Sequence, residues 1–66
     1  MTLTVNGDPR EVPAGTTVAG LVGAVTDRTR GIAVAVNGAV VPRAEWPGST
    51  LRDGDRVEVL TAAQGG

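Results

Sequence analysis

The sequence contains no cysteine, histidine, lysine, tyrosine or phenylalanine, and Trp46 is its single aromatic residue. Without cysteine and histidine there can be no disulfide, no typical zinc site and no Ser-His or Cys-His nucleophilic pair. The lack of lysine also excludes a Schiff-base side chain. The remaining reactive groups are one serine, eight threonines and seven carboxylates in 66 residues. We therefore expect no catalytic residues, no metal site and no enzyme activity of the chain's own.

The charge is nearly balanced, with six arginines against seven acidic residues and a net charge of −1. A protein that binds nucleic acid normally has a basic stripe with stacking aromatics, so no nucleic acid partner is expected. No apolar run approaches the ~18 residues that a membrane span requires. We expect no membrane partner and a cytoplasmic location, which the absence of cysteine fits.

Alternation of apolar and polar or small residues predicts strands, and two Asn-Gly pairs predict tight hairpin turns between them. Asn6-Gly7 separates the first strand from a second one whose Pro9 requires an edge position. Asn37-Gly38 joins the third and fourth strands. The repeated Val-Asn-Gly triplet is interpreted as the same turn chemistry used twice, not as an internal repeat. The five predicted strands are 1–5, 8–12, 32–36, 39–41 and 56–60.

One helix is predicted from apolar residues that recur at i, i+3, i+4 and i+7, namely Val18, Leu21, Val22 and Val25. Thr16 or Thr17 can cap its start. Two glycines inside it, at positions 20 and 23, each weaken the helix by ~1 kcal/mol relative to alanine. Such a helix needs packing against a sheet for its stability.

Three other segments are predicted as connections. Residues 27–31 are read as a solvated loop and residues 43–51 as an irregular crossing segment. Asp53-Gly54-Asp55 is interpreted as a turn, because two carboxylates are too few ligands for a metal ion.

The element order strand, strand, helix, three strands predicts an α+β fold. We expect a ubiquitin-like β-grasp: a five-stranded mixed sheet, with one helix packed on one face and the first and last strands parallel at its centre. Other α+β sheets share this element order. The predicted division is a domain at 1–60 and a mobile C-terminal tail at 61–66. The expected core comprises Met1, Leu3, Val5, Val18, Leu21, Val22, Val25, Ile32, Val34, Val36, Val57 and Val59.

The chain ends in Gly65-Gly66, which offers a chemistry that needs no catalytic side chain. Glycine has no Cβ, so this end can enter a channel too narrow for other dipeptides. It presents an unhindered α-carboxylate that is ionised at neutral pH. Such a carboxylate can attack the α-phosphate of ATP and give an acyl-adenylate, which a sulfur or amine nucleophile then displaces. In such a scheme the terminus of the protein would itself be the substrate.

Three features together resemble the ThiS family, the sulfur carriers of thiamine biosynthesis: the stretch Val36 to Arg43 followed by Trp46, the turn at 53–55 and the Gly-Gly end. The resemblance implies that a ubiquitin-activating-like adenylyltransferase adenylates the Gly66 carboxylate with ATP. By the same resemblance, Gly66 is the modified residue and Gly65 gives access to it. The resemblance further implies that a cysteine desulfurase or other donor supplies sulfur for a thiocarboxylate, which thiazole synthase consumes. The carrier itself holds no cofactor. Arg43 and Trp46 match family positions, and we interpret both as structural.

Strand parity predicts which residues meet a partner. Val57 and Val59 point inward, so Glu58 and Leu60 lie on the open side of the sheet beside the tail. These two residues and Gln64 of the tail are the candidate partner contacts. Alternative functions are the small subunit of molybdopterin synthase, a ubiquitin-like modifier joined to lysines, and a β-grasp binding module with an incidental Gly-Gly end.

Overall fold

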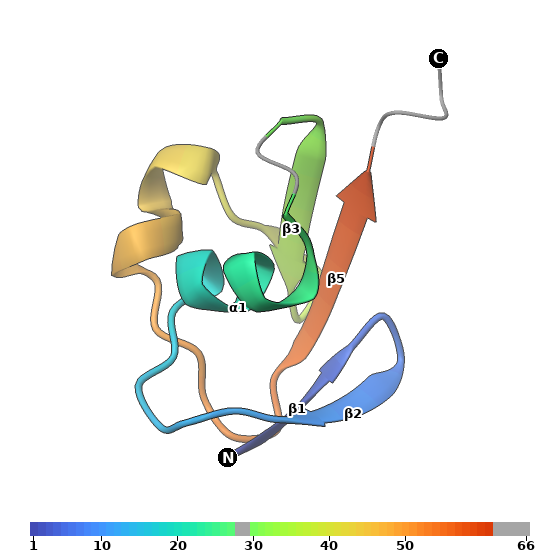
Figure 1. Cartoon of the computed structure of the whole chain (residues 1–66), viewed down its shortest axis with the longest axis vertical. Helices are drawn as coiled ribbons and strands as arrows, with labels where there is room; N and C mark the ends of the chain where they lie inside the picture. The colour runs from blue at the N-terminus through green and yellow to red at the C-terminus, as the bar shows by residue number, and fades with distance from the viewer. Residues whose placement is uncertain (28–29, 62–66) are drawn as a thin grey trace.

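The computed structural model describes residues 1–27 and 30–61. Its elements in chain order are β1 (Thr2–Val5), β2 (Asp8–Glu11), α1 (Val18–Val25), β3 (Ile32–Val36), β4 (Ala39–Val40), the 3-10 helix η1 (Arg43–Gly48) and β5 (Arg56–Thr61). The strands form one sheet in the order β2-β1-β5-β3-β4, with α1 packed across one face (Figure 1). This is the predicted α+β arrangement of a five-stranded mixed sheet with one main helix.

The last strand, β5, occupies the centre of the sheet. It runs parallel to β1, with Val5 opposite Val57, and antiparallel to β3, with Val36 opposite Val57 on the other side. The parallel pairing of the first and last strands is therefore confirmed. Because β5 lies between β1 and β3, the last described residues of the chain are at the centre of the sheet and not at an edge.

Both Asn-Gly pairs form the predicted hairpin turns. Asn6 and Asn37 each have a φ of 52°, and the glycines that follow them have φ of 87° and 86°. Two successive residues of positive φ match the right-handed twist of a two-residue hairpin, which explains the residue choice. Pro9 lies in β2, at the edge of the sheet, where its missing N–H costs no ladder hydrogen bond.

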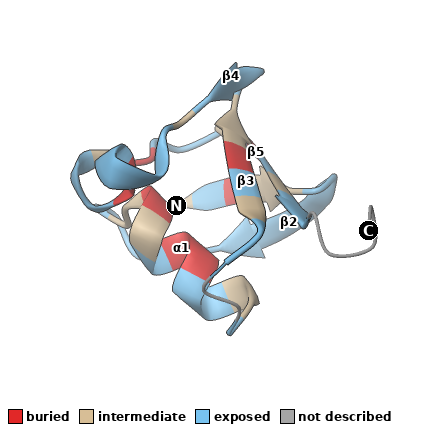
Figure 2. Cartoon of the chain, turned by 90° about the horizontal axis from the view of Figure 1, so that it is seen from above, coloured by how far each residue is buried: buried red, intermediate tan, exposed pale blue. Residues whose placement is uncertain are grey.

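The helix begins where its sequence predicted. The Thr17 hydroxyl accepts a hydrogen bond from the Gly20 N–H at 3.1 Å and so caps the first turn. Val18, Leu21 and Val22 are buried against the sheet, as the red segments of α1 indicate in Figure 2. At the other end, the guanidinium of Arg10 donates to the carbonyl of Ala24 at 3.4 Å. This contact places a cation near the C-terminus of a helix that has no basic residue in its own last turn.

The observed core shares six residues with the predicted one and adds two others. The buried set is Leu3, Val18, Leu21, Val22, Val34, Trp46, Leu51 and Val57. Trp46 and Leu51 were absent from the predicted core, and six of the twelve predicted members, including Met1 and Val59, are only partly buried. A single sheet face and a short helix cannot enclose twelve large side chains, so the segment before β5 completes the enclosure.

That segment is also more regular than predicted. Residues 43–51 were expected to be irregular, whereas Arg43–Gly48 form the helix η1. The Trp46 indole N–H donates to the Val41 carbonyl at 2.9 Å, and the Arg43 guanidinium lies 5.2 Å from the ring centroid. The indole thus anchors η1 against the core, which fits the structural role predicted for Trp46 and Arg43.

Among the described residues, no helix is both long and apolar enough to cross a membrane.

Candidate functional site

The candidate site is the end of β5 and the face of the sheet beside it. β5 extends to Thr61, one residue into the segment predicted as a tail. The predicted contact Gln64 and the Gly65-Gly66 end lie outside the described residues. The structure therefore describes the strand that precedes the last five residues.

Side chains of β5 alternate as parity predicted. Val57 is fully buried and Val59 is half-buried, whereas Glu58 and Leu60 are exposed on the side away from α1. Leu60 is 61% exposed, and it is one of two large aliphatic side chains exposed in the described part of the chain. The structure thus places both candidate contacts on the uncovered side of the central strand.

Residues opposite Glu58 and Leu60 extend this surface. Ala33 lies opposite Leu60, Ala35 lies opposite Glu58, and Val40 lies opposite Ala35 on the next strand. Directly opposite residues share one face of a sheet, so the five side chains form one surface, hereafter the open face. The open face has small alanines at its middle and large aliphatic residues at two of its corners.

Val40 was missed as a candidate by the sequence reasoning. It is 73% exposed, more than Leu60. The signal that could have found it is the register of the second hairpin, since a two-residue turn at Asn37-Gly38 sets Val40 opposite Ala35. The strand β4 has only two residues, so alternation alone could not assign Val40 to a face.

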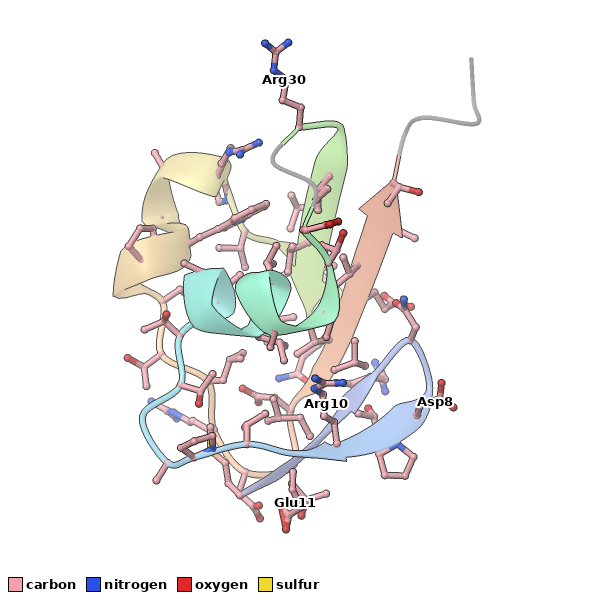
Figure 3. All side chains as sticks on the ribbon, in the orientation of Figure 1. Asp8, Arg10, Glu11 and Arg30 are labelled. Carbon is pink, nitrogen blue, oxygen red and sulfur yellow. The ribbon has the colours of Figure 1, made fainter. Side chains whose placement is uncertain are left out.

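A hollow of about 310 Å³ lies where β3 begins and β5 ends. Its lining residues are Gly31, Ile32, Ala33, Leu60 and Thr61. The lining is mainly apolar and adjoins the point at which the described part of the chain ends. Arg30 projects from the same end of the molecule (Figure 3). An apolar side chain of another protein could enter this hollow next to the departing C-terminus.

The turn at residues 53–55 is built by hydrogen bonds from its two carboxylates. Asp53 accepts from the Thr2 N–H at 2.8 Å, and Asp55 accepts from the Arg52 N–H at 2.8 Å and from the Asn37 side-chain amide at 2.9 Å. Gly54 has a φ of 87°. The predicted turn is therefore present, and both carboxylates help to hold it. In the described part of the chain, no group of three or more acidic side chains could hold a metal ion.

Two asparagine side chains hold β5 from opposite sides. Asn6 donates from Nδ2 to the Val59 carbonyl at 3.1 Å and accepts from the Val59 N–H through Oδ1 at 2.8 Å. Asn37 accepts from the Arg56 N–H through Oδ1 at 2.9 Å. Sequence reasoning assigned these asparagines to turns only, because their contacts with β5 depend on the tertiary arrangement.

The sequence matches the ThiS family over residues 3–66. This chain belongs to the ThiS family. It is 32% identical over 66 residues to the sulfur carrier protein ThiS of Escherichia coli (strain K12), and the match covers both chains completely. It is also 33% identical over 66 residues to a thiazole synthase of Paramagnetospirillum magneticum, where it spans 20% of that protein's length.

Solved structures of a ThiS family protein share the fold. The crystal structure of a thiamine biosynthesis protein (ThiS) from Geobacter metallireducens is similar at a TM-score of 0.83 and 36% identity, covering 92% of this chain and 93% of that one. The solution structure of a thiamine biosynthesis protein from the same organism gives a TM-score of 0.74 at 36% identity, covering 91% and 81%. The predicted β-grasp fold is confirmed by these relatives together with the strand order.

Proposed function

We propose that this ThiS family protein is a sulfur carrier for thiazole formation in thiamine biosynthesis. The observation that carries the proposal is the end-to-end match to the Escherichia coli sulfur carrier, which includes the C-terminal residues. The protein acts as a co-substrate and not as an enzyme, and the reacting group is the carboxylate of Gly66. The cytoplasm, which the sequence favours, is where ATP is available for this reaction.

The proposed chemistry has three stages. The Gly66 carboxylate attacks the α-phosphate of ATP in an adenylyltransferase of the ubiquitin-activating type, and pyrophosphate leaves. A persulfide that a cysteine desulfurase supplies then displaces AMP to give an acyl disulfide, and a thiol reduces its S–S bond, which leaves a thiocarboxylate. Another donor that supplies sulfide displaces AMP and gives the thiocarboxylate directly. Thiazole synthase takes up that sulfur and regenerates the carboxylate. ATP is bound by the adenylating enzyme, and the carrier requires no cofactor of its own.

Thiazole synthase is proposed as a partner because of the Paramagnetospirillum magneticum relative. A region the length of this chain lies within that longer protein, which is called a thiazole synthase. The same relative favours the thiamine pathway over the small subunit of molybdopterin synthase. It also favours a sulfur carrier over a lysine-linked modifier and over a binding module whose Gly-Gly end is incidental.

The open face and the adjoining hollow are proposed as the surface that partners contact. Leu60 is exposed, lines the hollow and lies at the end of β5. Full burial of a leucine side chain contributes ~1.5–3 kcal/mol, and burial of the part of Leu60 that is exposed contributes correspondingly less but still favours an apolar contact. Glu58 on the same strand offers a charge for orientation, and Gln64 is proposed to contact the partner along the tail.

The test is ATP–pyrophosphate exchange catalysed by the adenylating enzyme. The full chain should stimulate exchange, and a chain that lacks Gly65 and Gly66 should not, because the attacking carboxylate is then displaced and its approach hindered. Equal exchange with both chains would favour the binding-module alternative. Circular dichroism of both chains checks that the deletion leaves the fold intact.

A further inference from the structure

We infer that Asn6 is a positioning residue for sulfur transfer, because its side chain fixes the end of β5 from which the reactive C-terminus departs. The inference rests on the proposed carrier function. It begins from the unequal lengths of β1 and β5. The parallel ladder joins Thr4 to Arg56 and Val5 to Val57 and ends there, whereas β5 continues to Thr61.

The Asn6 side chain takes the place of the missing strand. The backbone N–H of Asn6 donates to the Val57 carbonyl at 2.9 Å. Its side-chain amide then forms both hydrogen bonds of Val59, donating to the carbonyl at 3.1 Å and accepting from the N–H at 2.8 Å. A primary amide has the same donor and acceptor as a peptide group, so it can extend a ladder by one residue.

The geometry requires asparagine at this position. Asn6 has a φ of 52°, a conformation that asparagine, aspartate and glycine adopt more readily than other residues. Of these three, only asparagine carries both a donor and an acceptor. Aspartate would keep the acceptor for the Val59 N–H but would place a second oxygen against the Val59 carbonyl.

Asn37 provides a natural comparison at the opposite end of the same strand. It has the same φ of 52°, its backbone N–H donates to the Arg56 carbonyl at 2.7 Å, and its Oδ1 accepts from the Arg56 N–H at 2.9 Å. Asn37 therefore holds the start of β5, far along the strand from the C-terminus. Loss of either side chain should cost similar stability, but only Asn6 holds the end next to the tail.

The two hydrogen bonds between the Asn6 side chain and Val59, hereafter the clamp, determine the length of chain that must be ordered when a partner binds. Five residues beyond Thr61 reach ~17 Å when extended, and seven residues beyond Val59 reach ~24 Å. Leu60 and Thr61 are also paired with Ala33 and Ile32 of β3, so loss of the Asn6 side chain loosens β5 along its β1 side only. In the molecules in which residues 60 and 61 then leave the sheet, the longer tether lowers the effective concentration of Gly66 by about 1.7-fold. Leu60 also loses its fixed place on the open face, and its backbone must be ordered again on docking.

The experiment compares Asn6→Gly with Asn37→Gly, since glycine accepts the positive φ and removes only the side chain. Hydrogen exchange should accelerate at the Val59 amide in the first variant and at the Arg56 amide in the second. With the adenylating enzyme, Asn6→Gly should raise the KM for the carrier by about three- to tenfold at nearly unchanged kcat. Asn37→Gly should leave KM within twofold of the parent once the folded fraction is taken into account.

Asn6→Asp serves as the second variant. It keeps the acceptor for the Val59 N–H but sets a carboxylate oxygen against the Val59 carbonyl, so its KM should also exceed that of the parent. An equal rise of KM in the Asn6→Gly and Asn37→Gly variants, or no rise in either, would overturn the positioning role. If the parent chain itself supports no adenylation, the proposed function fails. Hydrogen exchange tests the inference separately: an unchanged exchange rate of the Val59 amide in Asn6→Gly would show that the Asn6 side chain does not hold β5.

Discussion

Leu60 lies directly opposite Ala33 in the antiparallel pair of β3 and β5, on the face of the sheet that α1 leaves uncovered. The small alanine leaves one side of the leucine open, and together the two residues line the hollow at the end of the sheet. An exposed leucine in this setting adds nothing to the core. It lies three residues after Val57, which pairs with β1, and near the end of β5, which is why we propose that it contacts a partner.

The first prediction concerns Leu60→Asp. The fold should be retained, because the side chain is 61% exposed, while adenylation should slow through a higher KM as a charge enters an apolar contact. Val40→Asp is the comparison within the same open face, since it makes the same kind of change at a 73% exposed residue on β4. We expect a smaller effect there, because β4 lies at the edge of the sheet and β3 separates it from β5. A normal rate for Leu60→Asp would remove Leu60 from the interface.

The second prediction concerns Trp46, whose indole N–H donates to the Val41 carbonyl. Trp46→Phe keeps an aromatic ring but leaves that carbonyl without its donor, so the free energy of unfolding should fall by about 1–3 kcal/mol. Trp46→Ala should cost about 3–5 kcal/mol, which is comparable to the whole stability expected of so small a domain. Urea titration followed by circular dichroism measures both. Equal stability of Trp46→Phe and the parent would show that the hydrogen bond contributes nothing.

The third prediction concerns the glycines of α1. A Cβ built on Gly23 meets no heavy atom within 4 Å, so Gly23→Ala should raise the free energy of unfolding by about 0.5–1 kcal/mol. Gly54→Ala is the control of opposite sign. Its φ of 87° should cost about 1–2 kcal/mol although space is equally open there. Thermal unfolding of the two variants distinguishes backbone conformation from steric room, and a loss of stability in Gly23→Ala would contradict this account of the helix.

The fold could be predicted to a large extent because its signals are local. Two Asn-Gly turns set the register of both hairpins, and the 3.6-residue period with a threonine cap gave the helix. Trp46 and Leu51 lie in no periodic pattern, so the sequence did not predict their burial. They are buried because η1 and the segment after it cover the core. The contacts of Asn6 with Val59 join residues 53 positions apart. No local pattern in the sequence encodes such a contact.

The candidate site was predictable in part. Parity placed Glu58 and Leu60 on the open face, whereas Val40 required the register of a two-residue strand. Gly65, Gly66 and Gln64 lie outside the described residues, so their roles stay predictions that chemistry must test.

The most direct test of the carrier function is the intact mass of the chain after incubation with ATP, the adenylating enzyme and a sulfur source. The account predicts a gain equal to one oxygen replaced by sulfur, located at Gly66 and absent from a chain that lacks this residue. An unchanged mass under conditions in which the same enzyme converts the Escherichia coli carrier would contradict it.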